Sequence, residues 1–133
     1  MTEVTQGRPT VLVVDDEEDL RDIMRRMLER RGFAALVAAD SEAALAVCRE
    51  HPGVIDVLVT DLSMPGTSGG DLARLASELR PEMSVVYISG MSRDLAVTKG
   101  LIGPYALLVQ KPFTADLLLG ALHSVLGRRA SAV

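Results

Sequence analysis

The chain has 133 residues, of which 48% are hydrophobic and 24% charged, and these values are typical of one folded domain, not of a disordered chain. The net charge of -4 argues against a basic nucleic-acid-binding face, and the single cysteine excludes an internal disulfide. No apolar run approaches the ~20 residues that span a membrane, and residues 1–9 lack the apolar core of a signal peptide. We therefore expect a cytoplasmic domain at residues 10–127, with a flexible lead at 1–9 and a tail at 128–133.

Five segments rich in β-branched and aliphatic residues have the composition of strands buried on both faces. They are expected at Thr10–Val14, Phe33–Ala38, Val54–Asp61, Met83–Ser89 and Ala106–Val109.

A segment of helical character follows each strand. The first helix ends at Gly32, and the next three are expected from Asp40 or Ser41 to His51, at Asp71–Leu79 and at Ser92–Lys99. Thr114 caps a last helix that runs through Leu126 and ends at Gly127, and its core-facing residues are Leu117, Leu118, Ala121, Leu122 and Val125. Alternation of strands and helices predicts a flavodoxin-like, doubly wound (βα)5 α/β fold with a parallel sheet of order 2-1-3-4-5.

Polar side chains stand at the ends of four of these strands. Asp15 and Asp16 follow the first strand, Asp61 ends the third, Ser89 ends the fourth and Lys111 follows the fifth. The carboxyl ends of parallel strands share one edge of the sheet, so three carboxylates would meet there and repel unless a cation compensates them. Hard oxygen ligands favour Mg²⁺, and the lysine and the hydroxyl suit phosphoryl oxygens. The set predicts a phosphoryl-transfer site that forms an aspartyl phosphate on Asp61.

Four motifs together resemble the receiver domain of two-component response regulators. They are Val13-Val-Asp-Asp-Glu17, Val59-Thr-Asp-Leu-Ser-Met-Pro-Gly66, Ile88-Ser-Gly90 and Lys111-Pro-Phe113, and the resemblance extends from Thr10 to about Leu126. It implies that Asp61 accepts a phosphoryl group from a phosphohistidine on a sensor histidine kinase or a phosphotransfer protein. It also implies a signalling domain that catalyses only its own phosphorylation and dephosphorylation, and is otherwise no enzyme.

The resemblance also implies a set of metal ligands beside Asp61. Asp16 would bind Mg²⁺ directly and Asp15 mainly through water. The backbone carbonyl of Ser63 would be a further ligand, with its direction fixed by Pro65-Gly66.

The residues that would respond to phosphorylation are implied in the same way. Lys111 would contact the phosphoryl group and be joined to Pro112 by a cis bond, and Ser89 would be the switch hydroxyl. The family usually has an aromatic switch residue three positions before the lysine, where this chain has Leu108; Tyr105 is nearby but out of register. The short helix in Ser92–Pro104 is expected to move.

The partners implied are the phosphodonor protein and a downstream effector protein, with no direct contact to nucleic acid or membrane. The motifs around Ile88 and Lys111 are similar to receivers of hybrid histidine kinases. This favours a receiver separated from its kinase, or a single-domain regulator, over a transcription factor.

Three other functions remain open. A phosphatase of the haloacid dehalogenase type normally has an Asp-x-Asp motif on the first strand, whereas Asp15 and Asp16 are adjacent. A flavodoxin-like nucleotide or flavin binder needs a glycine-rich loop after the first strand, where this chain has acids. A constitutive interaction module would not need the acidic site.

Overall fold

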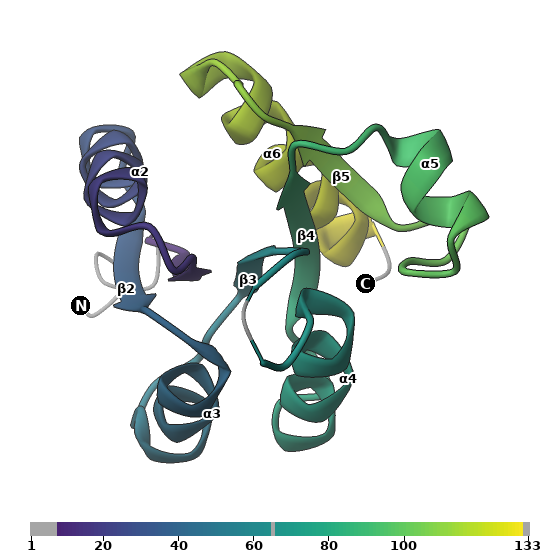
Figure 1. The fold of residues 1–133 in the computed structure, drawn as a ribbon. Helices are drawn as coiled ribbons and strands as arrows, with labels where there is room; N and C mark the ends of the chain where they lie inside the picture. Colours follow the sequence, from purple (N-terminus) through teal and green to yellow (C-terminus); the bar gives the residue numbers. More distant parts are fainter. Residues whose placement is uncertain (1–7, 65, 132–133) are drawn as a thin grey trace.

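The computed structural model describes residues 8–64 and 66–131 and has a five-stranded parallel sheet with helices on both faces (Figure 1). The strand order β2-β1-β3-β4-β5 confirms the predicted fold. The strands are β1 (Thr10–Val14), β2 (Ala34–Ala38), β3 (Val57–Asp61), β4 (Ser84–Ser89) and β5 (Leu107–Gln110). The helices are α2 (Glu18–Arg30), α3 (Ser41–Glu50), α4 (Gly69–Leu79), α5 (Arg93–Thr98) and α6 (Ala115–Ser131).

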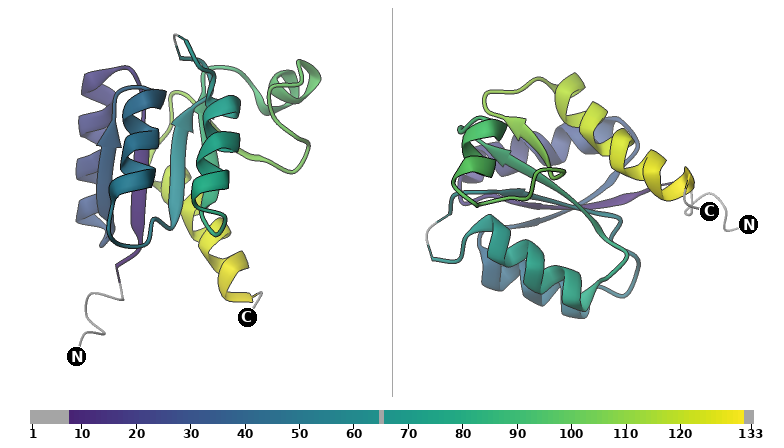
Figure 2. Two further views of the ribbon diagram at one scale, coloured as in Figure 1. Left: turned by 90° about the horizontal axis from the view of Figure 1, so that it is seen from below. Right: turned by 90° about the vertical axis from the view of Figure 1, so that its right-hand side faces the viewer.

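The helices form two layers, because the aliphatic strands need cover on both faces (Figure 2). Helices α2 and α6 pack on one face through a core that includes Met24, Leu28, Leu118 and Leu122. Helices α3 and α4 cover the other face, where the buried Cys48 lies in the core. Helix α5 stands beside β5 at the side of the sheet (Figure 1), over a much smaller cluster around Leu62, Ala96 and Ile102.

The third strand begins later than the sequence predicts. The predicted strand included Val54, which is 63% exposed, but the ladder starts at Val57. The carboxylate of Asp56 instead accepts the N–H of Thr10 at 2.7 Å, and the Asp56 N–H donates to the Thr10 carbonyl at 2.8 Å. These two bonds join the start of β3 to the start of β1.

Two helix boundaries and one helix face also differ from prediction. Helix α4 begins at Gly69, not Asp71, because Ser68 caps it by accepting the N–H of Asp71. Gly127 does not end the last helix, which continues to Ser131. Leu117 is 58% exposed, and Leu119 is buried in its place.

The predicted caps Asp40 and Thr114 are confirmed, since their side chains accept the N–H groups of Ala43 and Leu117 at 2.8 and 3.2 Å. The division into a lead at 1–9, a domain and a tail at 128–133 stays a prediction. Residues 1–7 and 132–133 lie outside the described residues, while the carbonyl of Pro9 already accepts the N–H of Ala34.

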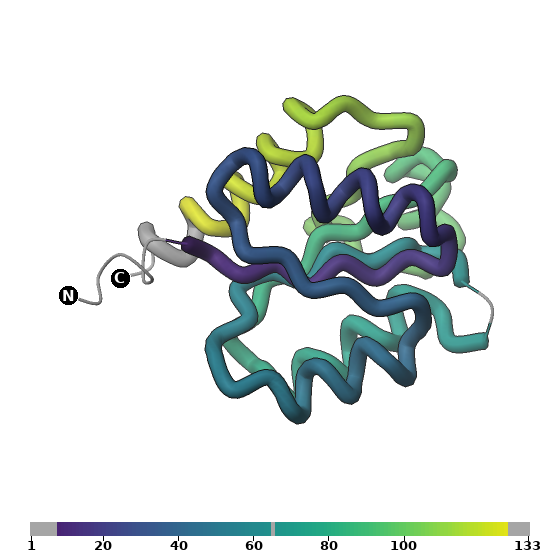
Figure 3. Tube along the Cα trace, turned by 90° about the vertical axis from the view of Figure 1, so that its left-hand side faces the viewer, coloured from purple at the N-terminus to yellow at the C-terminus, as the bar shows by residue number. Residues whose placement is uncertain are grey.

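The two ends of the sheet have different roles. Figure 3 shows the start of β1 and the end of α6 at one end of the molecule, with the β3–α4 loop at the other. At the first of these ends, the guanidinium of Arg80 donates to the carbonyls of Cys48, His51 and Gly53, which closes the end of α3. The carboxyl ends of the strands, and the predicted site, lie at the opposite end. No helix in the described part of the chain has both the length and the apolar character to cross a membrane.

Candidate metal centre

Two buried carboxylates come from neighbouring strands at the centre of the sheet. Asp15 follows β1 and is fully buried, and Asp61 ends β3 and is 6% exposed. One oxygen of each is fixed by a backbone N–H two residues further on: Glu17 N–H donates to Asp15 Oδ1 at 2.8 Å, and Ser63 N–H donates to Asp61 Oδ1 at 3.0 Å. The loops after β1 and β3 therefore hold each acid in one orientation, with its second oxygen directed elsewhere.

Lys111 joins these second oxygens. Its Nζ lies 3.2 Å from Asp15 Oδ2 and 3.0 Å from Asp61 Oδ2, so one ammonium bridges both acids. The backbone places it, because the Lys111 N–H donates to the Ser89 carbonyl at 2.7 Å and the Lys111–Pro112 peptide is cis, as predicted.

A third carboxylate completes an acidic cluster. Asp15, Asp16 and Asp61 each offer an oxygen, and these oxygens lie within 4.8 Å of one another. Asp16 is exposed, so the cluster opens to solvent on that side. Carboxylate oxygens with room for water are the donor set that a hard divalent ion such as Mg²⁺ takes, and the residues present fit such an ion.

The protonation equilibria reflect the excess of negative charge. Burial raises the pKa of Asp15, and the charge of Asp61 adds to this, against the opposing effects of the Glu17 N–H and Lys111. Burial alone would lower the pKa of Lys111, but its hydrogen bond and attraction to Asp61, together with the charge of Asp15, raise it overall. One lysine therefore only partly compensates three acids.

The other predicted site residues lie around this cluster. Ser89 is 2% exposed at the end of β4, and its Oγ accepts the N–H of Met91 at 3.0 Å. Among the described residues, it makes no hydrogen bond to Asp61. Leu108 lies on β5 directly beside Tyr87 of β4. The carbonyl of Ser63 as a metal ligand stays a prediction, and Pro65, expected to orient it, lies outside the described residues.

The sequence reasoning missed Gly69. A Cβ at this position would lie 2.2 Å from the carbonyl oxygen of Asp61 and 2.8 Å from the Cα of Leu62. Only glycine lets the start of α4 pass this close behind the acid. The signal was present in the pair Gly69-Gly70, which is unusual at the start of a helix.

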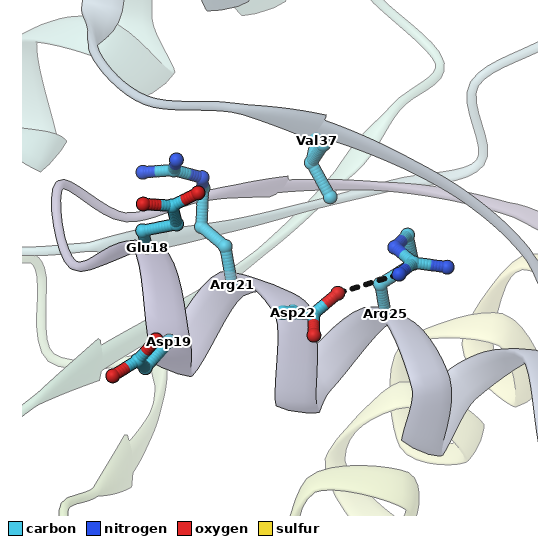
Figure 4. A pocket seen from close by; sticks show the side chains of 6 residues that line it. All are labelled: Glu18, Asp19, Arg21, Asp22, Arg25 and Val37. Carbon is cyan, nitrogen blue, oxygen red and sulfur yellow. Dashed lines mark hydrogen bonds and ion pairs between the residues drawn. The ribbon is translucent and has the colours of Figure 1, made fainter.

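A separate hollow of ≈ 230 Å³ lies between α2 and Val37 of β2 (Figure 4). In its wall Arg25 pairs with Asp22, and Arg25 also contacts Glu29 outside the hollow, while the guanidinium of Arg21 donates to the Asp15 carbonyl. Exposed ion pairs of this kind contribute little stability, and the described part of the chain has no second acidic cluster here that could hold a metal.

A family model of the response regulator receiver domain matches residues 11–123. The chain belongs to this family. The receiver is 37% identical over 123 residues to the sensory transduction protein RegX3 of Mycolicibacterium smegmatis, a match that covers 91% of this chain and 52% of that protein. It is also 34% identical over 88 residues to the sensor kinase CckA of Brucella abortus, covering 66% of this chain and 9% of the kinase.

Solved structures of receivers agree with this placement. The receiver domain of a response regulator from Clostridium thermocellum superposes with a TM-score of 0.80 at 30% identity, covering 94% of this chain and 99% of that one. The receiver domain of the hybrid histidine kinase CckA gives a TM-score of 0.74 at 31% identity, covering 88% and 98%. The protein is thus a receiver domain of two-component signalling, and it spans about half the length of the curated RegX3 relatives.

Proposed function

We propose that this receiver accepts a phosphoryl group on Asp61 from a phosphohistidine of a histidine kinase or a phosphotransfer protein, in the cytoplasm and with the help of Mg²⁺. The observation that carries the proposal is the bridge from Lys111 to Asp15 and Asp61 beside the exposed Asp16. A nucleophilic carboxylate, further acids for a divalent ion and a lysine for a phosphoryl oxygen are thereby brought together at the end of a rigid sheet.

The residues divide the chemistry between them. An oxygen of Asp61 attacks the phosphorus, the phosphorus–nitrogen bond breaks, and the electron pair and a proton remain with the departing imidazole. Asp15, Asp16, Asp61 and the Ser63 carbonyl would hold Mg²⁺, which neutralises charge on the phosphoryl oxygens when bound. Lys111 would bind an oxygen of the transferred phosphoryl group, because its Nζ already contacts the carboxylate of Asp61 that receives this group.

Positioning and charge are the contributions that this site can make to phosphoryl transfer. The N–H of Ser63 holds Oδ1 of Asp61. The other oxygen, Oδ2, would then be the one that attacks, once Lys111 turns from it to the incoming phosphoryl group. The buried Ser89 hydroxyl lies at the end of the next strand and would give the phosphoryl group a further donor. The second half of the cycle would be hydrolysis of the aspartyl phosphate in the same site.

The signal would pass to an effector protein through movement of α5. This helix buries only Ala96, so few apolar contacts oppose its displacement. Amide hydrogen exchange across Ser92–Pro104 should change when beryllium fluoride, a phosphoryl analogue, binds with Mg²⁺. Unchanged exchange there would contradict this route while leaving the chemistry of Asp61 intact.

Direct phosphorylation tests the central proposal. The protein incubated with acetyl phosphate and Mg²⁺ should gain one phosphoryl group, measured by intact-protein mass spectrometry, and Asp61→Asn should gain none. Asp71→Asn, at an exposed carboxylate on α4, is the matched control and should gain as much as the natural protein. Absence of any gain, or an equal gain in Asp61→Asn, would refute the proposal. Multiple turnover of a phosphomonoester would instead support the phosphatase alternative.

A further inference from the structure

The position of the missing aromatic switch residue has an aromatic neighbour on the next strand. Leu108 of β5 is the Cα partner of Tyr87 of β4, so both side chains lie on the same face of the sheet. Both pack against the small cluster beneath α5, formed by Leu62, Ala96 and Ile102. Tyr87 also packs against the larger core under α3 and α4, so its ring lies where the two clusters meet.

The ring of Tyr87 borders open space. It lines a cavity of ≈ 570 Å³ between the start of α4 and the loop Gly100–Gly103. At the edge of this cavity the two segments touch through their backbones, since a Cβ on Gly70 would lie 2.9 Å from the Leu101 carbonyl oxygen. Burial raises the pKa of the Tyr87 phenol, and no hydrogen bond to its hydroxyl is found among the described residues. No hydrogen bond therefore fixes the ring in its present place.

Tyr87 is also close in the chain to the predicted switch hydroxyl. Successive side chains of a strand alternate between faces, so Tyr87 and Ser89 share a face of β4. The Oγ of Ser89 now accepts the N–H of Met91, and Met91 packs into the cluster beneath α5. If the Ser89 hydroxyl turns to a phosphoryl group on Asp61, its hydrogen bond to the Met91 N–H breaks. Met91, which packs at the edge of the cluster, is then free to move.

We propose that Tyr87 is the positioning residue that takes the part of the absent aromatic at Leu108, its ring moving away from the cavity wall and deeper into the cluster beneath α5, which it already contacts, when Asp61 is phosphorylated. The movement removes the ring from the cavity wall, so the Gly100–Gly103 loop can change its position relative to α4. A ring is needed because it is the side chain that can fill the space vacated when Met91 and α5 shift. Ring position and phosphoryl binding are then coupled, and each affects the other equally. This inference rests on the proposed phosphorylation of Asp61.

The tyrosine content permits a direct test. The chain has two tyrosines and no tryptophan, and Tyr105 is 90% exposed. In the Tyr105→Phe variant, tyrosine fluorescence therefore reports on Tyr87 alone, and in Tyr87→Phe it reports on Tyr105 alone. Acrylamide quenching is measured for both variants with Mg²⁺, before and after addition of beryllium fluoride.

The expected result is reduced quenching of Tyr87 when beryllium fluoride binds, with quenching of Tyr105 unchanged. Replacing the ring in Tyr87→Leu should weaken beryllium fluoride binding roughly 5-fold or more, the range of ordinary allosteric coupling, while Tyr87→Phe keeps the affinity. Circular dichroism establishes that each variant is folded. If Tyr87→Leu does not fold, the quenching of Tyr87 in the Tyr105→Phe variant decides the proposal, because it measures movement of the ring with Tyr87 in place.

The two proposals fail in different ways. Binding of beryllium fluoride without any change in Tyr87 quenching overturns the role of Tyr87 and leaves the phosphorylation of Asp61 standing. Equal affinity for beryllium fluoride in Tyr87→Leu and the natural protein would also overturn the role of Tyr87 and leave the phosphorylation of Asp61 standing. If Asp61 takes up neither beryllium fluoride nor a phosphoryl group, the proposed function itself fails, and the role of Tyr87 with it.

Discussion

The loops after β1 and β3 differ from the loops after β4 and β5, although all four meet at one edge of the sheet. In the first pair, backbone N–H groups at Glu17 and Ser63 fix the buried carboxylates of Asp15 and Asp61. In the second pair, Ser89 holds Met91 by one hydrogen bond, and α5 rests on a small cluster. We infer that the first pair is built to hold charge in place and the second to change position. Substitutions can test whether this division is real.

The largest expected effect separates two adjacent glycines. Gly69 lies against the end of β3, and Gly70 lies against the segment between α5 and β5. A Cβ on Gly69 would lie 2.2 Å from the backbone oxygen of Asp61, whereas one on Gly70 would lie 2.9 Å from that of Leu101. We expect Gly69→Ala to lower the free energy of unfolding by about 3 kcal/mol and Gly70→Ala by about 1 kcal/mol, because overpacking against backbone forces main-chain shifts. Urea denaturation gives both values.

Mg²⁺ affinity distinguishes the Gly69→Ala and Gly70→Ala variants more directly than stability does. Titration calorimetry should show weaker binding in Gly69→Ala, where Asp61 is displaced, and unchanged binding in Gly70→Ala. Equal losses of Mg²⁺ affinity in both variants would mean that the contact between α4 and the Gly100–Gly103 loop also controls the metal site.

A smaller effect is expected from removing the bridging ammonium. Lys111→Met leaves Asp15 and Asp61 without their shared partner, and we expect a loss of about 2 kcal/mol in the absence of metal, less than for a fully buried pair because Lys111 is partly exposed. Affinity for Mg²⁺ should rise, since no ammonium competes for the same oxygens. Lys99→Met, which removes the other lysine of the chain at the end of α5, should change neither quantity. Unaltered Mg²⁺ affinity in Lys111→Met would show that the lysine and the ion do not compete.

The smallest effect concerns pH. Because the pKa of Asp15 is raised in the folded protein, its favourable contribution is complete below the unfolded pKa and is lost as pH rises through the folded pKa. At neutral pH and without metal, the ionised Asp15 is therefore destabilising. Asp15→Asn should raise the free energy of unfolding by about 1 kcal/mol at pH 7, and by less in acid.

Thermal unfolding at several pH values, with and without Mg²⁺, measures this gain. Stabilisation by Mg²⁺ should be lost in Asp15→Asn, and Asp16→Asn, at an exposed carboxylate, should leave the metal-free stability nearly unchanged. Destabilisation of Asp15→Asn at every pH would show that its bond to Lys111 outweighs the cost of burying the charge.

The strands, their order and the approach of Asp15, Asp16, Asp61 and Lys111 were predictable from sequence. Continuous β-branched runs define buried strands, and parallel strands necessarily bring their carboxyl ends together. Asp15 directly follows its strand and Asp61 ends its own, so the sheet fixes where their backbones lie.

Features set by packing were not predictable in the same way. The helical phase of α6 turned Leu117 outward and Leu119 inward, and Gly127 stayed helical because helix propensity is a weak preference. The closeness of Gly69 to Asp61 depends on how α4 returns to the sheet. The neighbour of Leu108 depends on the strand register, which pairs it with Tyr87.

Cys48 gives the protein a practical property. It is the single cysteine of the chain and lies buried between α3 and the sheet, where burial raises the pKa of its thiol. Maleimide and methanethiosulfonate reagents are electrophiles that react with the nucleophilic thiolate, so they should leave Cys48 largely unmodified in the folded protein. A cysteine introduced on the exposed side of α5, as in Thr98→Cys, would then carry a fluorescent or spin label without removal of the natural thiol.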